Sequence, residues 1–256
     1  MSTIAVFGAG PGLSRSVARR YGREGYEVVL VSRTAEKLEA FADELSGEGI
    51  TAHAVPADLS APAVVPELAT RIREVAGDVD VIYYAPVSAV TFVPAAELTA
   101  DDIVASTALL VETFAALVAE FLPHMRATRA GAILTAQGAT ALAGIPDMSG
   151  PGPAMAAQRN WLQALGKELA PAGVVVGRLY ISALIENSAI HQGLTAAGKK
   201  LPGAALVDPD ALADRLFEVH RKGRPAELSA PRGSRWWFPL TGTKPVRRLM
   251  KKVGSR

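Results

Sequence analysis

Short apolar, β-branched runs alternate along this chain with longer stretches of helical periodicity. Six runs are typical of strands buried on both faces, and they span residues 3–8, 27–32, 51–55, 80–85, 131–136 and 174–181. Helical patterns cover about 13–24, 35–46, 60–76, 99–128, 153–170 and 208–221. This alternation predicts a parallel sheet with helices on both faces and right-handed crossovers. We therefore expect one doubly wound α/β domain.

Composition narrows the functional classes. The 256 residues contain no cysteine, so a disulfide framework, a thiolate metal site and a cysteine nucleophile are excluded. The lack of cysteine favours a reducing compartment, and we expect a cytoplasmic protein. No basic leader precedes the first apolar run, and we expect no segment that approaches the roughly 20 apolar residues of a membrane span. Nothing groups the four histidines, so no metal site is predicted.

Charge is distributed unevenly. Residues 232–256 hold eight basic and no acidic residues, which leaves 19 basic against 25 acidic residues in 1–231, a net charge of −6. A body of that sign is a poor binder of polyanions, so nucleic acid is not an expected partner. The basic end also has apolar residues at helical spacing. It is expected to dock on the acidic body, with contact to an acidic membrane as the alternative.

A glycine-rich turn follows the first strand. Gly8 permits a tight turn, Gly12 lets the backbone approach a pyrophosphate, and the free N–H groups of the next helix face the phosphate charge. Gly10 and Leu13 complete this turn. In a strand–helix–strand unit of this length the pattern predicts a dinucleotide site, the alternative being a merely structural turn.

The second strand indicates which dinucleotide binds. An NAD site places a carboxylate there for the ribose, whereas this strand ends in Ser32 and Arg33, with no acid before Glu36. A hydroxyl and a guanidinium suit a 2′-phosphate. We therefore predict NADP(H), with Arg33 as a solvated residue at a helix start as the alternative.

The order and spacing of these motifs are similar to those of the short-chain dehydrogenase/reductases. The resemblance includes the Gly-x-x-x-Gly-x-Gly turn with Ser14 at its third glycine, "ADLS" at 57–60, "FLPHM" at 121–125 and "LGKELAPAGVVVG" at 165–177. It covers about residues 3–230 and implies a Rossmann fold that transfers a hydride between a nicotinamide and a carbinol or carbonyl. It also implies a homodimer or homotetramer formed by the helices at 99–128 and 153–170.

The resemblance implies a division of the chain into segments and further residues that contact the cofactor. A Rossmann-type domain is expected over residues 1–231, with a possible substrate lid at 186–207 and a basic extension at 232–256. Asp58 would hydrogen-bond the adenine ring, although it is also a plausible helix cap. The remaining implied cofactor contacts are Leu59, Ala85, Pro86 and Ile185.

The family's acid–base set is missing at the matching positions. Its Tyr supplies a proton, its Lys lowers the pKa of that Tyr, its Ser orients the carbonyl and its Asn holds a water. The corresponding residues here are Pro151, Met155, Gly138 and Leu110. None of the five tyrosines has a lysine four residues later, so the pair is absent and not shifted. We therefore predict a non-standard active site.

Three residues are candidates to replace the missing groups. Tyr180 ends the sixth strand and would be a proton donor. The alternative is a core tyrosine whose hydroxyl reaches solvent. Gln137 would orient a carbonyl or support the backbone. Arg159 would supply a cation one turn after Met155, or form a structural salt bridge.

The leading hypothesis is an NADP(H)-binding oxidoreductase that reduces a small, largely apolar carbonyl, imine or enone. Such substrates include some that need little protonation when the hydride arrives. The alternatives are a non-redox enzyme, such as an isomerase, dehydratase or cyclase, and a catalytically inactive binding partner of an active relative.

Overall fold

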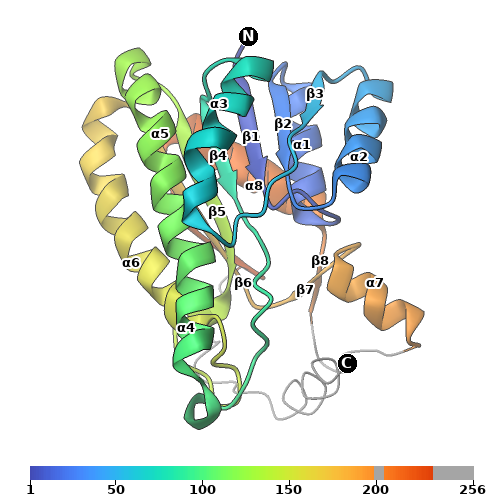
Figure 1. Cartoon of the computed structure of the whole chain (residues 1–256), viewed down its shortest axis with the longest axis vertical. Helices are drawn as coiled ribbons and strands as arrows, with labels where there is room; N and C mark the ends of the chain where they lie inside the picture. Colours follow the sequence, from blue (N-terminus) through green and yellow to red (C-terminus); the bar gives the residue numbers. More distant parts are fainter. Residues whose placement is uncertain (199–204, 233–256) are drawn as a thin grey trace.

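The computed structural model describes residues 1–198 and 205–232, and its centre is a seven-stranded parallel sheet (Figure 1). The strand order is β3-β2-β1-β4-β5-β6-β9. The strands are β1 (Thr3–Phe7), β2 (Glu27–Val31), β3 (Ala52–Ala54), β4 (Val81–Tyr84), β5 (Ala132–Gly138), β6 (Val175–Ile181) and β9 (Glu227–Ala230). The order reverses between β1 and β4, where ligands of such sheets bind. The predicted doubly wound fold is confirmed.

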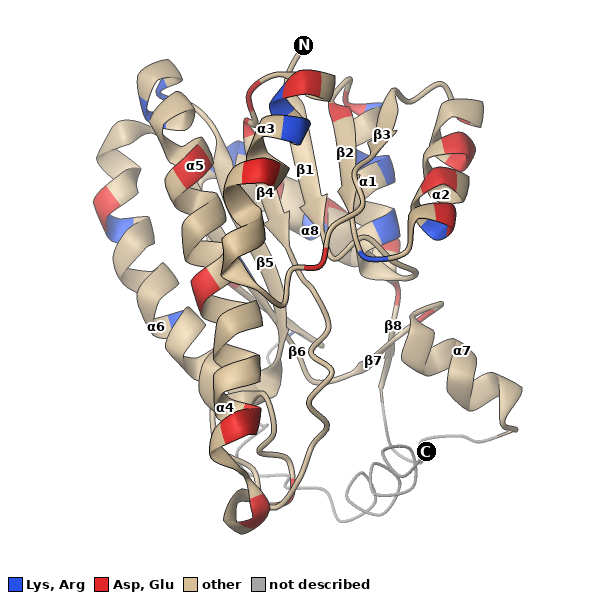
Figure 2. Cartoon of the chain, in the orientation of Figure 1, with Lys and Arg blue, Asp and Glu red and all other residues tan. Residues whose placement is uncertain are grey.

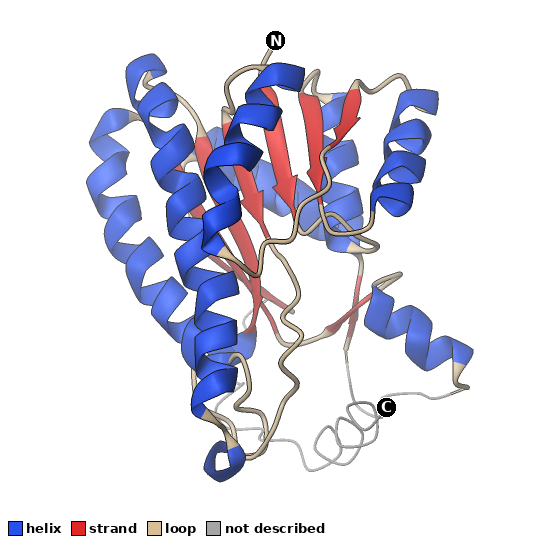
Figure 3. Ribbon diagram, viewed as in Figure 1, coloured by secondary structure: helices blue, strands red, loops and turns tan. Residues whose placement is uncertain are grey.

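Helices cover both faces of the sheet (Figure 3). One apolar cluster contains core residues of α1 (Leu13–Arg23), α2 (Ala35–Gly47) and α8 (Pro209–Lys222). The cluster on the other face contains core residues of α3 (Val65–Ala76), α5 (Thr113–Thr128) and α6 (Gly152–Leu169). Short 3₁₀ turns lie at Pro62–Val64, Ala95–Glu97, Ala139–Ala141 and Ala170–Ala172. The two covered faces account for the strands' continuous apolar character.

β9 is a strand that the periodicity did not predict. Its four residues, "ELSA", are short and lie between Pro225 and Pro231, so the local pattern is that of a loop. In the structure β9 pairs with β6, with Ala230 opposite Ile181. Its place in the sheet is thus set by the neighbouring strand.

The helix expected over 99–128 is interrupted. α4 (Ala100–Thr107) and α5 are joined by a π-helical turn, Ala108–Glu112. The Tyr84 hydroxyl donates to the Leu109 carbonyl, and the Gln158 side-chain amide donates to the Leu110 carbonyl. Because π-turns weaken the helical hydrogen-bond ladder, these two side chains satisfy carbonyls that the turn frees.

The same helical stretch corrects the expectation about membrane spans. Ala100–Thr128 is long and apolar enough to cross a bilayer by length and composition, with a mean hydropathy of 1.7 in its best window. A core helix of a soluble protein passes the same test, and here Phe114, Leu117 and Phe121 pack into the core. The stretch gives only weak support for a span.

The expected lid contains regular structure. β7 (Leu184–Ile185) pairs in parallel with β8 (Leu206–Val207), and α7 (Ala189–Ala196) lies between them in the chain. Figure 1 shows this unit beyond the carboxyl ends of the main strands. Residues 199–204 and the expected extension from residue 233 onward lie outside the described residues.

Candidate functional site

The glycine turn brings the backbone of β1 against the end of β4. Gly8 has a φ of 84°, and a Cβ added there would lie 2.6 Å from Cα of Pro86. Its N–H donates to the Val31 carbonyl at 2.9 Å, and Ala85 N–H donates to the Phe7 carbonyl at 3.0 Å. Only glycine fits this junction. Gly8, Ala85 and Pro86 therefore lie together, as the predicted cofactor contacts require.

Gly12 is the N-cap of α1 and adopts a φ of 82°. No side chain caps this helix and its first turn holds no acidic residue, so the N–H groups of the first turn remain available to an anion. A Cβ on Gly12 would lie 3.0 Å from Cα of Ser188. The helix terminus and the start of the lid thus meet at this glycine.

Ser14 fits at the position of the third glycine. Its side chain is 8% exposed, and its hydroxyl donates to the Gly8 carbonyl at 3.0 Å. The hydroxyl therefore fixes the turn that precedes it. Leu13 is buried beside it, whereas Gly10 borders open space: a Cβ added there would meet only the Gly8 carbonyl oxygen, at 3.9 Å.

The adenosine end of the predicted site brings Arg33 and Asp58 near each other. Arg33 is exposed just after β2. The Asp58 carboxylate accepts from Ser60 N–H at 3.0 Å. That hydrogen bond, followed by the charge of Arg33, lowers the pKa of Asp58. The predicted helix-cap role of Asp58 is wrong, because the following helices begin after Ala61 and Val64 without a side-chain cap and Asp58 closes only the turn at Ser60. The predicted contact with the adenine ring stays a prediction.

Three other predicted contacts follow strands of the main sheet. The Ser32 carbonyl accepts from Ala57 N–H at 2.9 Å, which joins the ends of β2 and β3. Leu59 is buried, and its carbonyl accepts from the Thr113 hydroxyl at 2.9 Å. Ile185 packs on the α1-side core, and its carbonyl accepts from the Ser188 hydroxyl at 2.8 Å. All three thus come after the carboxyl ends of strands: Ser32 after β2, Leu59 after β3 and Ile185 after β6.

Gly138 and Met155, at the family's Ser and Lys positions, lie side by side. A Cβ on Gly138 would be 3.7 Å from the Met155 sulfur. Pro151, at the Tyr position, is buried at the N-cap of α6. The three positions that the resemblance assigns to acid–base chemistry carry no group that titrates or donates a strong hydrogen bond.

A hydroxyl that the sequence analysis did not single out lies in this place. The Thr140 Oγ1 is 3.5 Å from the position a Cβ on Gly138 would take, and it contacts the Met155 sulfur at 3.6 Å. Thr140 is 6% exposed. The sequence contained one signal for this residue, a hydroxyl side chain two positions after Gly138. The 3₁₀ turn Ala139–Ala141 brings that hydroxyl back toward Gly138.

Gln137 belongs to a buried amide chain. Its Nε2 donates to Oε1 of Gln158, whose own Nε2 donates to the Leu110 carbonyl. Because a carbonyl can only accept, this last bond fixes the orientation of both amides. The Oε1 of Gln137 is buried and has no hydrogen-bond partner within residues 1–198 and 205–232. Gln137 therefore presents a free acceptor.

Tyr180 and Arg159 lie on the α6 side of β6. The Tyr180 ring is 1% exposed, and burial, followed by the charge of Glu227, raises the pKa of Tyr180 to about 12. Arg159 lies over this ring at 5.7 Å and is 3.5 Å from the Glu227 carboxylate. A pKa this high makes the phenol a weak acid at neutral pH. The geometry of Arg159 matches the structural salt bridge that was its alternative.

The elements of the unit beyond the main sheet are uncharged. β7, α7 and β8 contain no Lys, Arg, Asp or Glu, and Figure 2 shows tan ribbon throughout them. The described residues also contain no group of three or more His, Cys, Asp or Glu that would hold a metal ion. The site therefore combines a phosphate-type cradle with a neutral, largely apolar end.

Comparisons with known proteins agree with this geometry. The family model described as short chain dehydrogenase matches residues 2–188. A very-long-chain 3-oxoacyl-CoA reductase of Aspergillus terreus is 30% identical over 181 residues, 68% of this chain and 50% of that protein. Its counterpart from Coccidioides immitis is 28% identical over 89% of this chain and 63% of its own length. The matches thus span about half to two thirds of these relatives.

Solved structures share the fold. A short-chain dehydrogenase from Sphingobium yanoikuyae in complex with NADPH has a TM-score of 0.74 at 24% identity, with 98% of this chain and 96% of that chain covered. A metagenomic short-chain oxidoreductase in complex with NADP has a TM-score of 0.73 at 22% identity, covering 89% and 95%. With the family model matching most of the sequence, the chain belongs to the short-chain dehydrogenase family.

Proposed function

We propose that this protein is an NADP(H)-dependent oxidoreductase with a non-standard active site. Its substrate would be a small, largely apolar carbonyl, imine or enone. The observation that carries the proposal is the pairing of a complete glycine cradle at Gly8 and Gly12 with apolar residues where the family has its acid–base set.

The residues of the cradle fit a dinucleotide. A Cβ at Gly8 or Gly12 would occupy the space in which backbone segments meet, and the uncapped start of α1 offers N–H groups to a pyrophosphate. Arg33, exposed after β2, would hold a 2′-phosphate. The relatives solved with NADP and NADPH support this choice of cofactor. When bound, the nicotinamide supplies or accepts the hydride.

The protein's own groups would bind and orient the substrate. The Thr140 hydroxyl would donate to a substrate carbonyl oxygen next to Gly138, in place of its contact with the Met155 sulfur. Met155 and the uncharged elements β7, α7 and β8 would exclude water from an apolar substrate. The α6 side of β6 would contribute Tyr180, Gln137 and Arg159. These residues would pack against the substrate and give its surroundings a polar character. Substrates that need little protonation during hydride transfer suit such a site, with water completing the proton transfer.

Two measurements test this proposal. Calorimetric titration should show NADPH binding more tightly than NADH, with the preference reduced in Arg33→Ala and kept in Arg23→Ala, an exposed control at the end of α1. Loss of absorbance by NADPH with ketones, imines or enones should then identify a substrate class. Equal affinity for both nucleotides, or no oxidation with any of these substrates, would count against the proposal.

The absence of the acid–base groups also supports a second candidate function, which does not transfer a hydride. A non-redox enzyme or an inactive binding partner would need none of the Ser, Tyr and Lys groups that Gly138, Pro151 and Met155 replace. Conversion of a substrate without net redox change, undiminished after nucleotide removal, would favour the enzyme. Co-purification with an active relative, without turnover, would favour the partner.

We also propose that the chain forms a homodimer or homotetramer through α4, α5 and α6, and that it acts in the cytoplasm. Only 33% of the apolar window in Ala100–Thr128 is buried within one chain, and Val104 on α4 is 65% exposed. Exposed large apolar side chains on a helix are expected where a second subunit would cover them. Light scattering after size exclusion should give the mass of a dimer or tetramer, and a Val104→Glu variant should shift it toward the monomer.

A further inference from the structure

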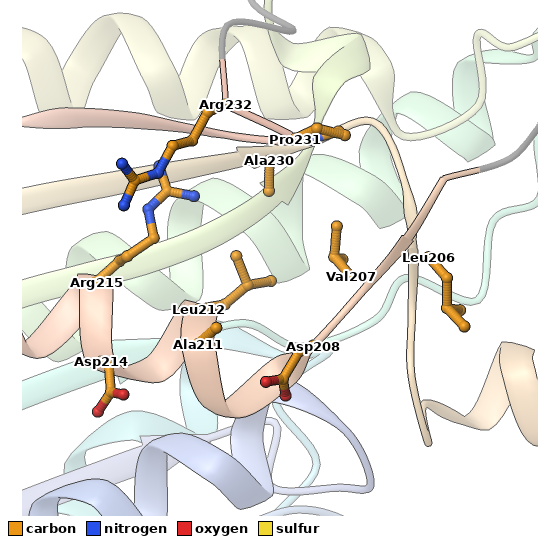
Figure 4. Close-up of a pocket in the computed structure, with 10 residues that line it drawn as sticks. All are labelled: Leu206, Val207, Asp208, Ala211, Leu212, Asp214, Arg215, Ala230, Pro231 and Arg232. Atoms are coloured by element: carbon orange, nitrogen blue, oxygen red, sulfur yellow. The ribbon is translucent and has the colours of Figure 1, made fainter.

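A pocket of about 500 Å³ lies between α8, β8 and the end of β9 (Figure 4). Most of its wall is apolar. These side chains are Leu206, Val207, Ala211, Leu212, Ala230 and Pro231. Such a composition accommodates the hydrocarbon part of a ligand.

Two arginines form one end of this pocket. Figure 4 shows the guanidinium groups of Arg215 and Arg232 next to each other. Arg215 donates to the Ser229 carbonyl at 2.9 Å, and burial, followed by the charge of Arg232, lowers the pKa of Arg215. Within residues 1–198 and 205–232, neither guanidinium forms an ion pair with a carboxylate. Two adjacent cations without a counterion are a place where an anion is stabilised.

The two carboxylates that line the pocket are engaged elsewhere. Asp214 is 2.7 Å from the Arg20 guanidinium on α1. Asp208 is the N-cap of α8, and its side chain accepts from Asp210 N–H at 2.9 Å. These carboxylates are therefore already used for helix packing and capping.

The remaining residues of the chain do not offer acidic side chains either. Residues 233–256 contain seven basic residues and no Asp or Glu. An acidic side chain from this segment cannot neutralise the pair, so the candidate counterion is an external anion.

The pocket lies close to the candidate active site along the sheet. Gly138 is the register partner of Ile181, and Ile181 is the register partner of Ala230. With neighbouring strands about 4.8 Å apart, the backbone of the pocket at Ala230 is about 10 Å from Gly138. The pocket also shares β8 with the lid, since Val207 pairs with Ile185 of β7.

We propose that this pocket binds an organic anion with an apolar body, whose terminal carboxylate or phosphate is held by Arg215 and Arg232. The oxyanion would accept hydrogen bonds from both guanidiniums, and the hydrocarbon would cover the wall formed by β8, α8 and β9. This site is distinct from the dinucleotide cradle, and its existence does not depend on the proposed redox reaction.

Calorimetric titration of the full-length protein with hexanoate, hexyl phosphate and 1-hexanol tests the proposal. Both anions should bind more tightly than the neutral alcohol, and the tighter anion identifies the preferred head group. Arg232→Gln and Arg215→Gln should each weaken anion binding about tenfold or more, because each removes a charged hydrogen-bond donor. Arg221→Gln, an exposed arginine of α8 outside the pocket, should leave the affinity unchanged.

One further variant and one control measurement guard against a folding artefact. Arg215→Lys keeps the charge but loses the planar fork, so an intermediate loss is expected. Arg232 is exposed, so its variant should retain the thermal transition of the wild type. The proposal is overturned if neither anion binds at millimolar concentration, or if both arginine variants bind as the wild type does.

Discussion

The sulfur of Met155 lies 3.7 Å from the point that a side chain on Gly138 would first occupy. This is ordinary van der Waals contact, and the φ of Gly138 is −63°, which any residue adopts. We expect Gly138→Ala to fold with an unfolding free energy within about 1 kcal/mol of the wild type. Urea denaturation followed by circular dichroism measures this.

Gly8→Ala is the matched contrast. Its φ of 84° and the 2.6 Å approach to Pro86 backbone leave no room for a methyl group. We expect a loss of more than about 2 kcal/mol, which combines left-handed strain with a backbone clash. Equal stability of the two variants would mean that the turn and the end of β4 do not meet as described.

Thr140 provides a test of carbonyl orientation. Once a substrate is known, Thr140→Val should reduce kcat/KM by about 100-fold, as expected for the loss of one donor to a developing oxyanion. Thr140→Ser, which keeps the hydroxyl, should stay within a few-fold. If valine and serine variants show the same rate, the hydroxyl has no role in turnover and the residue serves packing alone.

Gln158 is expected to matter for stability. Gln158→Leu leaves the Leu110 carbonyl and the Gln137 amide without their partners, and each unsatisfied buried group costs about 1–3 kcal/mol. We expect a total loss of about 2–6 kcal/mol in chemical denaturation. Gln192→Ala, whose amide is exposed on α7, should change the unfolding free energy by less than about 0.5 kcal/mol.

His220 makes stability dependent on pH. It stacks on Tyr21, whose hydroxyl is 3.1 Å from Nδ1, and burial lowers the pKa of His220. Between the lowered pKa and the unfolded value of about 6.5, the unfolded chain binds more protons, so stability falls as the pH falls below about 6.5. The melting temperature should show this loss between about pH 7 and pH 5.

Two variants isolate the histidine. His220→Gln should flatten the pH dependence over that window, because the titrating group is gone. Tyr21→Phe should lower stability at every pH while keeping the slope, since the imidazole remains buried. A slope unchanged by His220→Gln would assign the pH dependence to other groups.

The sheet and the cofactor cradle could be predicted because their signals are local. Gly8 and Gly12 occupy fixed positions between a strand and a helix, and the apolar runs of β1, β2 and β5 are buried on both faces. The seventh strand, β9, gave no such signal, because the composition of "ELSA" does not indicate a strand. Its hydrogen-bonded pairing with β6 makes it one. Strand propensity depends strongly on such neighbours.

The candidate site was only partly predictable for a similar reason. The order and spacing of the family motifs identified Gly138, Pro151 and Met155, because such spacing is readable along the chain. The approach of Thr140 to Gly138, the amide chain through Gln158 and the pairing of Arg215 with Arg232 depend on turns and on strands distant in sequence. The amide chain and the arginine pair form only after the sheet has brought their elements together.

The contact between Ser188 and Gly12 bears on the rate at which a bound nucleotide would leave. Ser188, the N-cap of α7 in the predicted lid, lies against the turn that would hold the pyrophosphate, so we expect this segment to move when a dinucleotide leaves. Motions of such segments take microseconds to milliseconds and often limit turnover. For the proposed oxidoreductase, we therefore expect nucleotide release to set the steady-state rate.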